Sequence, residues 1–326
     1  MESAEDLANE SKLMDSTPFV VGQLSLGQQA ELAYSHLELF ESVSFEGRIL
    51  DFKQAPVCAW LGPVEELRED CRAEMRKSYD PALGACYTFN GAGAKHPWRL
   101  RRAGLRGGLS LWLKVGQEDY LPWVSSAGFR LYVHNQSEIV TSSTPGYLAP
   151  AGMESSVALL HSQHRHLHQP YSACASDGSD PNLRQFYYQK TSFSKEACLL
   201  SCYQAALVKA CGCADPRYPS GPQHSNCPLA KRDCLNRFIS QRGAVDESAY
   251  KSQECFCPKA CRRGEYAASL SRAPYVDQVP LCQALRPVAN NSACRQSFAE
   301  NRARINVYMS QMAYFVFQET PAYGVK

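Results

Sequence analysis

Cysteine is the residue type whose number and spacing point most directly to chemistry in this sequence. The chain has 326 residues and 15 cysteines, and ten of these lie between Cys174 and Cys261. Thiols at this density are typical of disulfides in an oxidising compartment, because a reducing cytosol would leave them free. Two N-glycosylation triplets, beginning at Asn135 and Asn290, agree with that assignment. The sequence therefore predicts a domain that lies outside the cell.

The spacing of four of these cysteines indicates how they pair. Cys198 and Cys202 are four residues apart on a predicted helix, so they share one face about 6 Å apart. Cys255 and Cys257 lie in a non-helical stretch, where two extended residues advance about 6.6 Å. Antiparallel pairing would join the helix to the strand without strain: Cys198 with Cys257 and Cys202 with Cys255.

The other cysteines of this segment can extend the same ladder, although spacing alone does not fix their connectivity. Cys211 and Cys213 would continue it to Cys227 and Cys234, with Cys174 and Cys261 closing its base. Zinc is the alternative, since Cys-x-Cys and Cys-x3-Cys pairs can hold a metal. No histidine follows at ligand spacing, so we predict disulfides and no metal site.

Two other groups of residues could carry chemistry. Four histidines lie close together, at positions 161, 164, 166 and 168, and His164 and His168 would suit a Zn²⁺ or pH site if this segment were helical. A solvated linker is the favoured interpretation. Arg99 to Arg102 fits a furin-like cleavage pattern, but an exposed basic loop is favoured.

Enzyme signatures are missing from the sequence. We find no Gly-x-Ser-x-Gly, no His-Glu-x-x-His and no phosphate-binding glycine loop. The net charge is +2, so no large field of one sign would attract nucleic acid. We therefore expect neither an enzyme, nor a cofactor, nor a nucleic-acid partner.

The elements that must position the cysteines follow from hydrophobic periodicity. A capping box at Ser25 and Gln28 predicts a helix over 26–41, and a second helix follows Gly62-Pro63. Another helix is predicted over 195–210, with Ser194 as its cap and Gly212 just past its end. Strands are predicted over four short runs and along the tail: 86–89, 109–115, 129–134, 156–160 and 304–318. This composition predicts an α+β fold.

The ends of the sequence carry no visible export or membrane signal. The first sixteen residues are acidic and polar, and no run of about 18 apolar residues occurs. An oxidised domain without a route across a membrane is expected to be part of a longer chain.

Several segments make the sequence recognisable. These are CYTFN at 86–90, GLSLWLKVGQEDYLP at 108–122, VHNQSE at 133–138 and the cysteine set C-x3-C-x8-C-x-C followed by C-x-C-x3-C. Together they resemble the ectodomain of the degenerin/epithelial sodium channel/acid-sensing ion channel superfamily. The segment INVYMSQMAYFVFQETPAYGV at 305–325 is similar to the last palm strands of that family, which run into the second pore helix.

The resemblance implies a hand-like channel ectodomain without its two transmembrane helices. The expected regions are finger helices at 1–78, palm and β-ball strands at 79–173, a disulfide-rich thumb at 174–261, and a knuckle with the final palm strands at 262–326. It also implies a subunit of a trimeric, amiloride-sensitive sodium channel in the plasma membrane. Such a subunit would sense a stimulus, including an extracellular ligand, and couple it to pore opening in a homo- or heterotrimer.

The resemblance further implies how the remaining cysteines pair. The family's thumb pairing coincides with the ladder above, and Cys58 is expected to pair with Cys71 in the finger. Cys282 and Cys294 are natural mutual partners near the knuckle. Cys86 then remains unpaired, because its partner in the family lies in a region that this sequence lacks.

Particular residues are expected to couple the thumb to the pore. In the family, an aromatic residue three positions before the first thumb cysteine packs against the first membrane helix, and Tyr171 holds that position. The linker between the last two palm strands is Met312-Ala313 before Tyr314, where acid-sensing relatives have Leu-Asn. An acidic pair that contributes to proton sensing in those relatives is reduced to Ser137-Glu138, and a lone carboxylate cannot share a proton as a pair does, so gating by protons is disfavoured.

An alternative function belongs to another class of protein. A secreted, cystine-rich binding module could use the same scaffold. The two alternatives differ in whether apolar segments of about 20 residues flank the domain in the full reading frame.

Overall fold

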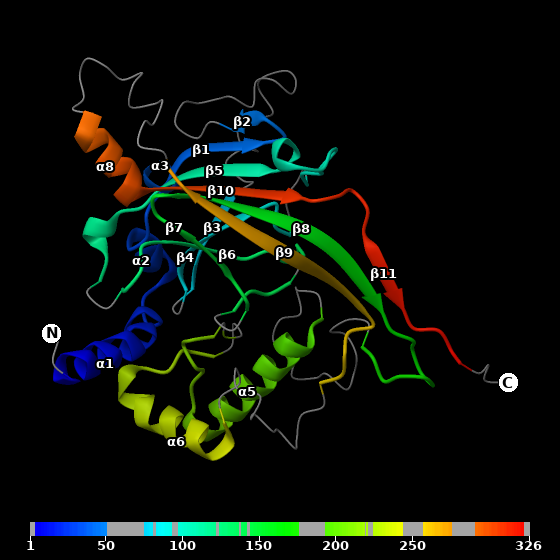
Figure 1. The fold of residues 1–326 in the computed structure, drawn as a ribbon. Coiled ribbons are helices and arrows are strands. Elements are labelled where there is room, and N and C mark those ends of the chain that lie inside the picture. Colours follow the sequence, from blue (N-terminus) through cyan, green and yellow to red (C-terminus); the bar gives the residue numbers. More distant parts are fainter. Residues whose placement is uncertain are drawn as a thin grey trace, which may run out of the picture.

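The computed structural model describes residues 4–50, 75–80, 83–92, 97–121, 124–136, 138–141, 144–175, 193–218, 220, 224–243, 257–275 and 291–322. Within these residues a seven-stranded sheet forms the centre of the molecule (Figure 1). A helical unit cross-linked by disulfides lies beside it. Helices and strands are both present, as the α+β prediction requires.

The N-terminal residues form three helices before the first strand. These are α1 (Ala4–Val21), α2 (Leu26–Glu31) and α3 (His36–Leu39). The predicted capping box at the start of α2 is confirmed, because the Ser25 amide donates to the Gln28 side chain and the Gln28 amide donates to the Ser25 hydroxyl.

The prediction of a single helix over 26–41 was wrong, because this segment contains α2, α3 and the start of a strand. Ser35 and Glu38 form a second capping box, so a new helix begins at His36. Phe40 then pairs with Leu113 of the sheet and is buried. Pairing within the sheet therefore outweighs the helical spacing of the apolar residues.

The central sheet contains strands from both ends of the chain. They are β1 (Phe40–Phe45), β2 (Arg48–Leu50), β5 (Leu109–Lys114), β8 (Met153–Arg165), β9 (Arg262–Pro274), β10 (Arg302–Met309) and β11 (Phe315–Gln318). The order is β11-β8-β10-β5-β1-β2, and β9 pairs with the other edge of β8. Strand β8 is parallel to β10 and β11, whereas the other pairs are antiparallel.

One face of this sheet is apolar and holds a core. Alternate residues of neighbouring strands, such as Val43, Leu111 and Ile305, point into it, as the two-residue period of a strand requires. Two hairpins pack against this core, β3 (Met75–Asp80) with β4 (Gly84–Phe89) and β6 (Gly128–Leu131) with β7 (Tyr147–Pro150). On the opposite face Phe298 of α8 (Asn291–Asn301) packs on Trp112.

The disulfide-rich unit consists of α5 (Lys195–Cys211), α6 (Arg232–Arg242) and the segments between them, including a short 3₁₀ turn at Leu229–Lys231. It has its own core, which also receives Phe19 of α1. Figure 1 shows α5 and α6 below the central sheet, beside α1.

The four short strands predicted from the sequence are confirmed, whereas the single long strand predicted for the tail is wrong. The four short runs correspond to β4, β5, β6 and β8. The tail forms two strands where one was predicted, because Ser310 leaves the ladder and both its amide and its hydroxyl donate to the carbonyl of Leu159.

The helix expected after Gly62-Pro63 lies outside the described residues. No helix of the described part combines the length and apolar character needed to span a bilayer.

Candidate functional site

Helix α5 positions the cysteines of the disulfide-rich unit, and the predicted caps at both of its ends are confirmed. The Ser194 hydroxyl accepts a hydrogen bond from the Ala197 amide at 3.0 Å. At the other end Gly212 has φ of 77°, and its amide donates to the Val208 carbonyl at 2.8 Å. A left-handed residue at this place ends a helix and satisfies its last carbonyls. The helix therefore stops where Cys211 and Cys213 must turn toward their partners.

Four disulfides lie within the described residues: Cys174–Cys261, Cys198–Cys257, Cys211–Cys234 and Cys213–Cys227. The last two settle the connectivity that spacing left open. Cys202 and Cys294 are also disulfide-bonded. The expected partners Cys255 and Cys282, and the expected pair of Cys58 with Cys71, lie outside the described residues.

Cys86 on β4 is a free cysteine. Burial, with a smaller contribution from the charge of Asp80, raises the pKa of its thiol to about 11. The thiol is therefore protonated at neutral pH.

Asp215 organises the interior of the disulfide-rich unit. Its carboxylate is fully buried and accepts hydrogen bonds from the Tyr203 hydroxyl and the Arg217 guanidinium, both at 2.7 Å. The amide and carbonyl of Asp215 bond the side chain of Gln204, which is also buried. Burial, together with the charge and hydrogen bond of Asp215, raises the pKa of Tyr203. This network locks α5 to the segment that carries Cys213.

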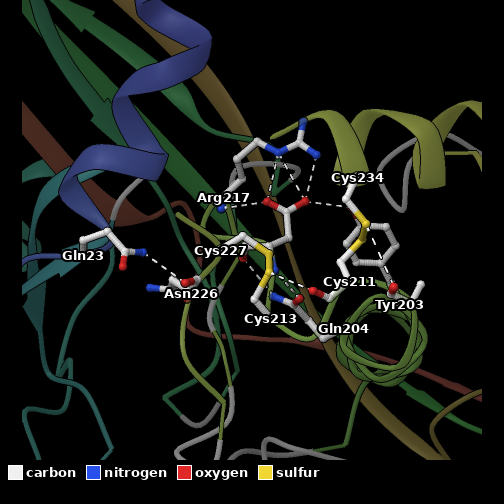
Figure 2. Close-up of a disulfide and its surroundings, with 11 residues drawn as sticks. Gln23, Tyr203, Gln204, Cys211, Cys213, Arg217, Asn226, Cys227 and Cys234 are labelled. Atoms are coloured by element: carbon white, nitrogen blue, oxygen red, sulfur yellow. Dashed lines mark hydrogen bonds and ion pairs between the residues drawn. A yellow bond between two sulfur atoms is a disulfide. The ribbon is translucent and has the colours of Figure 1, made fainter. Parts of the chain in front are cut away.

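A second contact ties the N-terminal helix to this unit. Figure 2 shows the Gln23 side chain directed at Asn226, whose carbonyl it reaches at 3.0 Å. The Asn226 side chain donates in return to the carbonyl of Gly22 at 3.0 Å. Arg232 of α6 lies 3.5 Å from a carboxylate oxygen of Asp15 on α1.

The base of the disulfide-rich unit is attached directly to the sheet. The Cys174–Cys261 bond lies next to the first residue of β9. The Ala175 amide donates to the Lys259 carbonyl at 2.9 Å, and the Cys261 amide donates to the Ala175 carbonyl at 2.8 Å. The Cys174–Cys261 disulfide and these two backbone hydrogen bonds therefore lie directly beside the strand pair β8 and β9.

Strands β8 and β11 end at the same place. The His166 amide donates to the Cys261 carbonyl at 2.9 Å, and the His166 ring nitrogen Nδ1 lies 2.7 Å from Glu319. Glu319 also accepts from the Leu167 amide at 3.0 Å, while its own amide donates to the Arg165 carbonyl at 3.0 Å. We call residues 165–168, Cys261 and Glu319 the junction. It joins the base of the disulfide-rich unit to the last strand.

Of the residues expected to couple motion, Tyr171 follows the junction along the chain, whereas Met312, Ala313 and Tyr314 precede β11 at its other end. Tyr171 belongs to the turn after β8, and its side chain is 44% exposed. Met312 and Ala313 lie in the exposed connection between β10 and β11. Tyr314 at the end of that connection lies 5.8 Å from the ring of His161. Their roles in gating stay predictions.

The histidines do not have the helical spacing that a metal site would need. His161 and His164 lie on β8, and His166 continues its pairing with β9. Within the described residues, two groups have side chains close enough to hold an ion: His168 with Cys174 and Cys261, and Cys198 with Cys202 and Cys257. Their cysteines are all disulfide-bonded, so they offer no thiolate.

The other expected sites are placed as follows. The basic loop is exposed at Arg99, Arg101 and Arg102, but Arg102 is tied to the carbonyl of Glu46 at 3.0 Å. The side-chain amide of Asn135 donates to Glu138 at 3.2 Å and to the Gly264 carbonyl at 3.0 Å. Asn290 and Ser137 lie outside the described residues.

Sequence reasoning missed two residues of this region. Asp215 lies two residues after Cys213, and its closeness to that cysteine was the one local sign that it belongs to the disulfide-rich unit. Glu319 contacts a residue 153 positions away in the sequence. No local pattern reports such a contact, because it depends on the parallel pairing of β8 and β11.

Comparison with known proteins identifies the family. The family model described as amiloride-sensitive sodium channel matches residues 14–326. Two similar proteins of Caenorhabditis elegans are the degenerin-like protein unc-105, 28% identical over 337 residues, and degenerin del-1, 30% identical over 299 residues. The alignments cover 99% and 91% of this chain but 35% and 41% of those relatives, so the chain spans about two fifths of their length or less. Since the match covers nearly the whole chain, the chain belongs to the degenerin/epithelial sodium channel/acid-sensing ion channel superfamily.

Proposed function

We propose that the chain is the extracellular domain of a sodium-channel subunit in the plasma membrane. It would assemble as an amiloride-sensitive trimer of identical or different subunits, sense a stimulus and couple it to pore opening. The hand-like arrangement is part of this proposal, with finger, palm, thumb and knuckle at 1–78, 79–173, 174–261 and 262–326.

The junction is the observation that supports a coupling role most strongly. A stimulus can do work on a pore only if displacement of one rigid part reaches another. The disulfides and the buried Asp215 network stiffen the helical unit, and the Cys174–Cys261 bond fixes its base to β9. From there the contact of His166 with Glu319 reaches the last strand. The path consists of bonded or hydrogen-bonded groups throughout.

The test is a recording of sodium current from the full-length subunit expressed in a cell. We expect a current that amiloride blocks, and a change of this current in response to a stimulus such as a pressure step. Tyr171→Ala should leave surface expression unchanged and weaken the response. Leu229→Ala is a matched control, since Leu229 is a similarly exposed apolar residue (46%) in the turn before α6, far along the chain from the end of β8.

Two results would contradict the proposal. If Tyr171→Ala gates like the unmodified channel, the coupling role of that residue is wrong. If the full-length protein appears in the medium and carries no current, the secreted binding module is the better description.

A further inference from the structure

The loop at 98–107, directly before β5, carries a concentration of positive charge that the proposed function does not use. Four of its ten residues are arginines, at positions 99, 101, 102 and 106, and all four are exposed. The whole chain has a net charge of only +2, so this loop is a local excess of one sign. Arginine keeps its charge at every physiological pH. A partner that recognises this loop must therefore supply negative charge.

Trp98 fixes the beginning of the loop to the neighbouring hairpin. Its amide donates to the Asn90 side chain at 2.9 Å, and the Asn90 side chain donates to the Trp98 carbonyl at 3.0 Å. The indole ring packs on Phe45 and Phe89, with ring centroids 5.1 Å and 6.3 Å away. The loop therefore starts from a fixed point beside the end of β4.

Glu46, in the turn between β1 and β2, holds the middle of the loop. Glu46 and Gly47 have φ of 52° and 78°, and two central residues with positive φ give this two-residue turn a defined shape. One carboxylate oxygen of Glu46 accepts the Arg101 amide at 2.6 Å. The Arg102 guanidinium donates to the Glu46 carbonyl at 3.0 Å and to the Arg106 carbonyl at 3.3 Å. Arg102 is thus an internal tie of the loop.

The end of the loop closes on β10 and on itself. The Gly104 amide donates to the Met309 carbonyl at 2.9 Å, and the Gly107 amide donates to the Gly104 carbonyl at 2.9 Å. A Cβ at Gly107 would lie 2.2 Å from the Arg102 carbonyl oxygen, so only glycine permits this close approach. The backbone is held at both ends and in the middle, so a partner would not have to order it, which lowers the entropic cost of binding.

Three arginine side chains remain available on this ordered backbone. Within the described residues, the guanidinium groups of Arg99, Arg101 and Arg106 have no hydrogen-bond or ion-pair partner. We call these three residues the arginine surface. A guanidinium group presents parallel N–H donors that match two oxygens of a sulfate, phosphate or carboxylate group. Several such groups on one loop suit an anion whose charges repeat along a chain.

From this arrangement we propose that the arginine surface binds a sulfated polysaccharide of the heparin type. Short segments rich in basic residues are typical of surfaces that bind nucleic acid or heparin. The disulfides of the described residues indicate an oxidising compartment, where sulfated polysaccharides rather than nucleic acids are the abundant polyanions. The placement outside the cell rests on the proposed function, whereas the binding chemistry rests on the loop alone.

Calorimetric titration of the oxidised 326-residue chain with a heparin octasaccharide tests the arginine surface. We expect binding at about 0.15 M NaCl. It should weaken as salt rises, with a slope of log K against log salt concentration of about −2 to −3 for three neutralised charges.

Variants of the three arginines connect this binding to the loop. Each of Arg99→Gln, Arg101→Gln and Arg106→Gln should lower the affinity about twofold to fivefold, the size expected of an exposed ion pair, and the three combined about tenfold or more. Arg237→Gln, which removes an exposed arginine of α6, is the matched control and should leave the affinity unchanged.

Lysine at the same three positions separates geometry from charge. Arg99→Lys, Arg101→Lys and Arg106→Lys combined keep the positive charges but remove the paired donors of the guanidinium groups. This variant should keep the salt dependence and bind heparin more weakly than the unmodified chain but more tightly than the combined glutamine variant.

The proposal is overturned if the chain does not bind heparin at physiological salt, if the combined glutamine variant binds as tightly as the unmodified chain, or if Arg237→Gln causes an equal loss. Tighter binding to vesicles of phosphatidylcholine and phosphatidylserine than to heparin would overturn it in favour of a lipid surface. Sodium current from a subunit that does not bind heparin would contradict the arginine surface alone. Heparin binding by a protein that carries no current would contradict only the channel function.

Discussion

The disulfide-rich unit depends on the partners of Asp215, because a buried carboxylate is tolerated only with full compensation. Here Arg217 supplies the charge, and Tyr203 supplies a further donor. Asp215→Asn leaves the guanidinium without its counter-charge. We predict a loss of about 3 kcal/mol in the free energy of unfolding, below the upper range for buried pairs because Arg217 is one third exposed. Urea unfolding followed by circular dichroism measures it.

The control for this change is Asp233→Asn, which removes an exposed carboxylate from the first turn of α6. It should cost less than about 1 kcal/mol, as expected for a charge near a helix terminus. Equal losses in the two variants would show that the buried network contributes no more than a surface charge.

Cys86 allows a second prediction at the scale of single residues. A pKa of about 11 in place of 9.0 lowers the thiolate fraction at pH 8 by about a hundredfold, and the thiolate is the reactive form. We therefore expect iodoacetamide to modify Cys86 about a hundred times more slowly in the folded chain than in urea. The rate should rise tenfold per pH unit up to about pH 11. Peptide mass spectrometry follows it, and a fast reaction at pH 8 would contradict the buried environment.

At the scale of elements, the end of α5 depends on one glycine. Gly212 has φ of 77°, and a Cβ there would meet no atom within 4 Å, so a substitution adds strain without a clash. Gly212→Ala should destabilise the chain by about 1 kcal/mol. Gly212→Asn should cost less, because asparagine tolerates the left-handed region. Thermal unfolding of both variants measures the difference, and an equal loss would point to a cause other than backbone conformation.

The elements also show what sequence could predict and what it could not. Helix α5 was predictable at both ends because its caps are local: Ser194 and Gly212 act on residues three or four positions away. The prediction of one helix over 26–41 was wrong because Phe40 pairs with Leu113 in the sheet, and Leu113 lies far along the chain. Local spacing reports local hydrogen bonds and carries no information on such pairing.

The same distinction applies to the candidate site. The helix face shared by Cys198 and Cys202 and the extended step to Cys257 follow from local geometry, and the structure joins Cys198 to Cys257. The junction could not be predicted, because it needs β8 and β11 to run parallel and to end together. Its histidines were visible in the sequence, whereas Glu319, the carboxylate partner of His166, became visible only in the fold.

At the scale of the whole molecule, two cores of different chemistry lie side by side. In the core of the disulfide-rich unit, five of the fifteen buried members are cysteines. The described core of the sheet has none among its eight buried members. The first core should therefore depend on oxidation, and the second should depend on apolar packing alone.

Reduction should separate these two parts. Each described disulfide closes a loop of 14 to 87 residues, and opening loops of this length costs about 3 kcal/mol or more apiece. In tris(2-carboxyethyl)phosphine we expect α5 and α6 to lose hydrogen-exchange protection first, while β1, β5 and β10 keep most of theirs. Because Cys261 also anchors β9, protection at its first residues should fall with the helical unit. If α5 and the central strands lose protection together, the molecule unfolds as one cooperative body. That result would contradict the proposal that a stiff unit moves against the sheet.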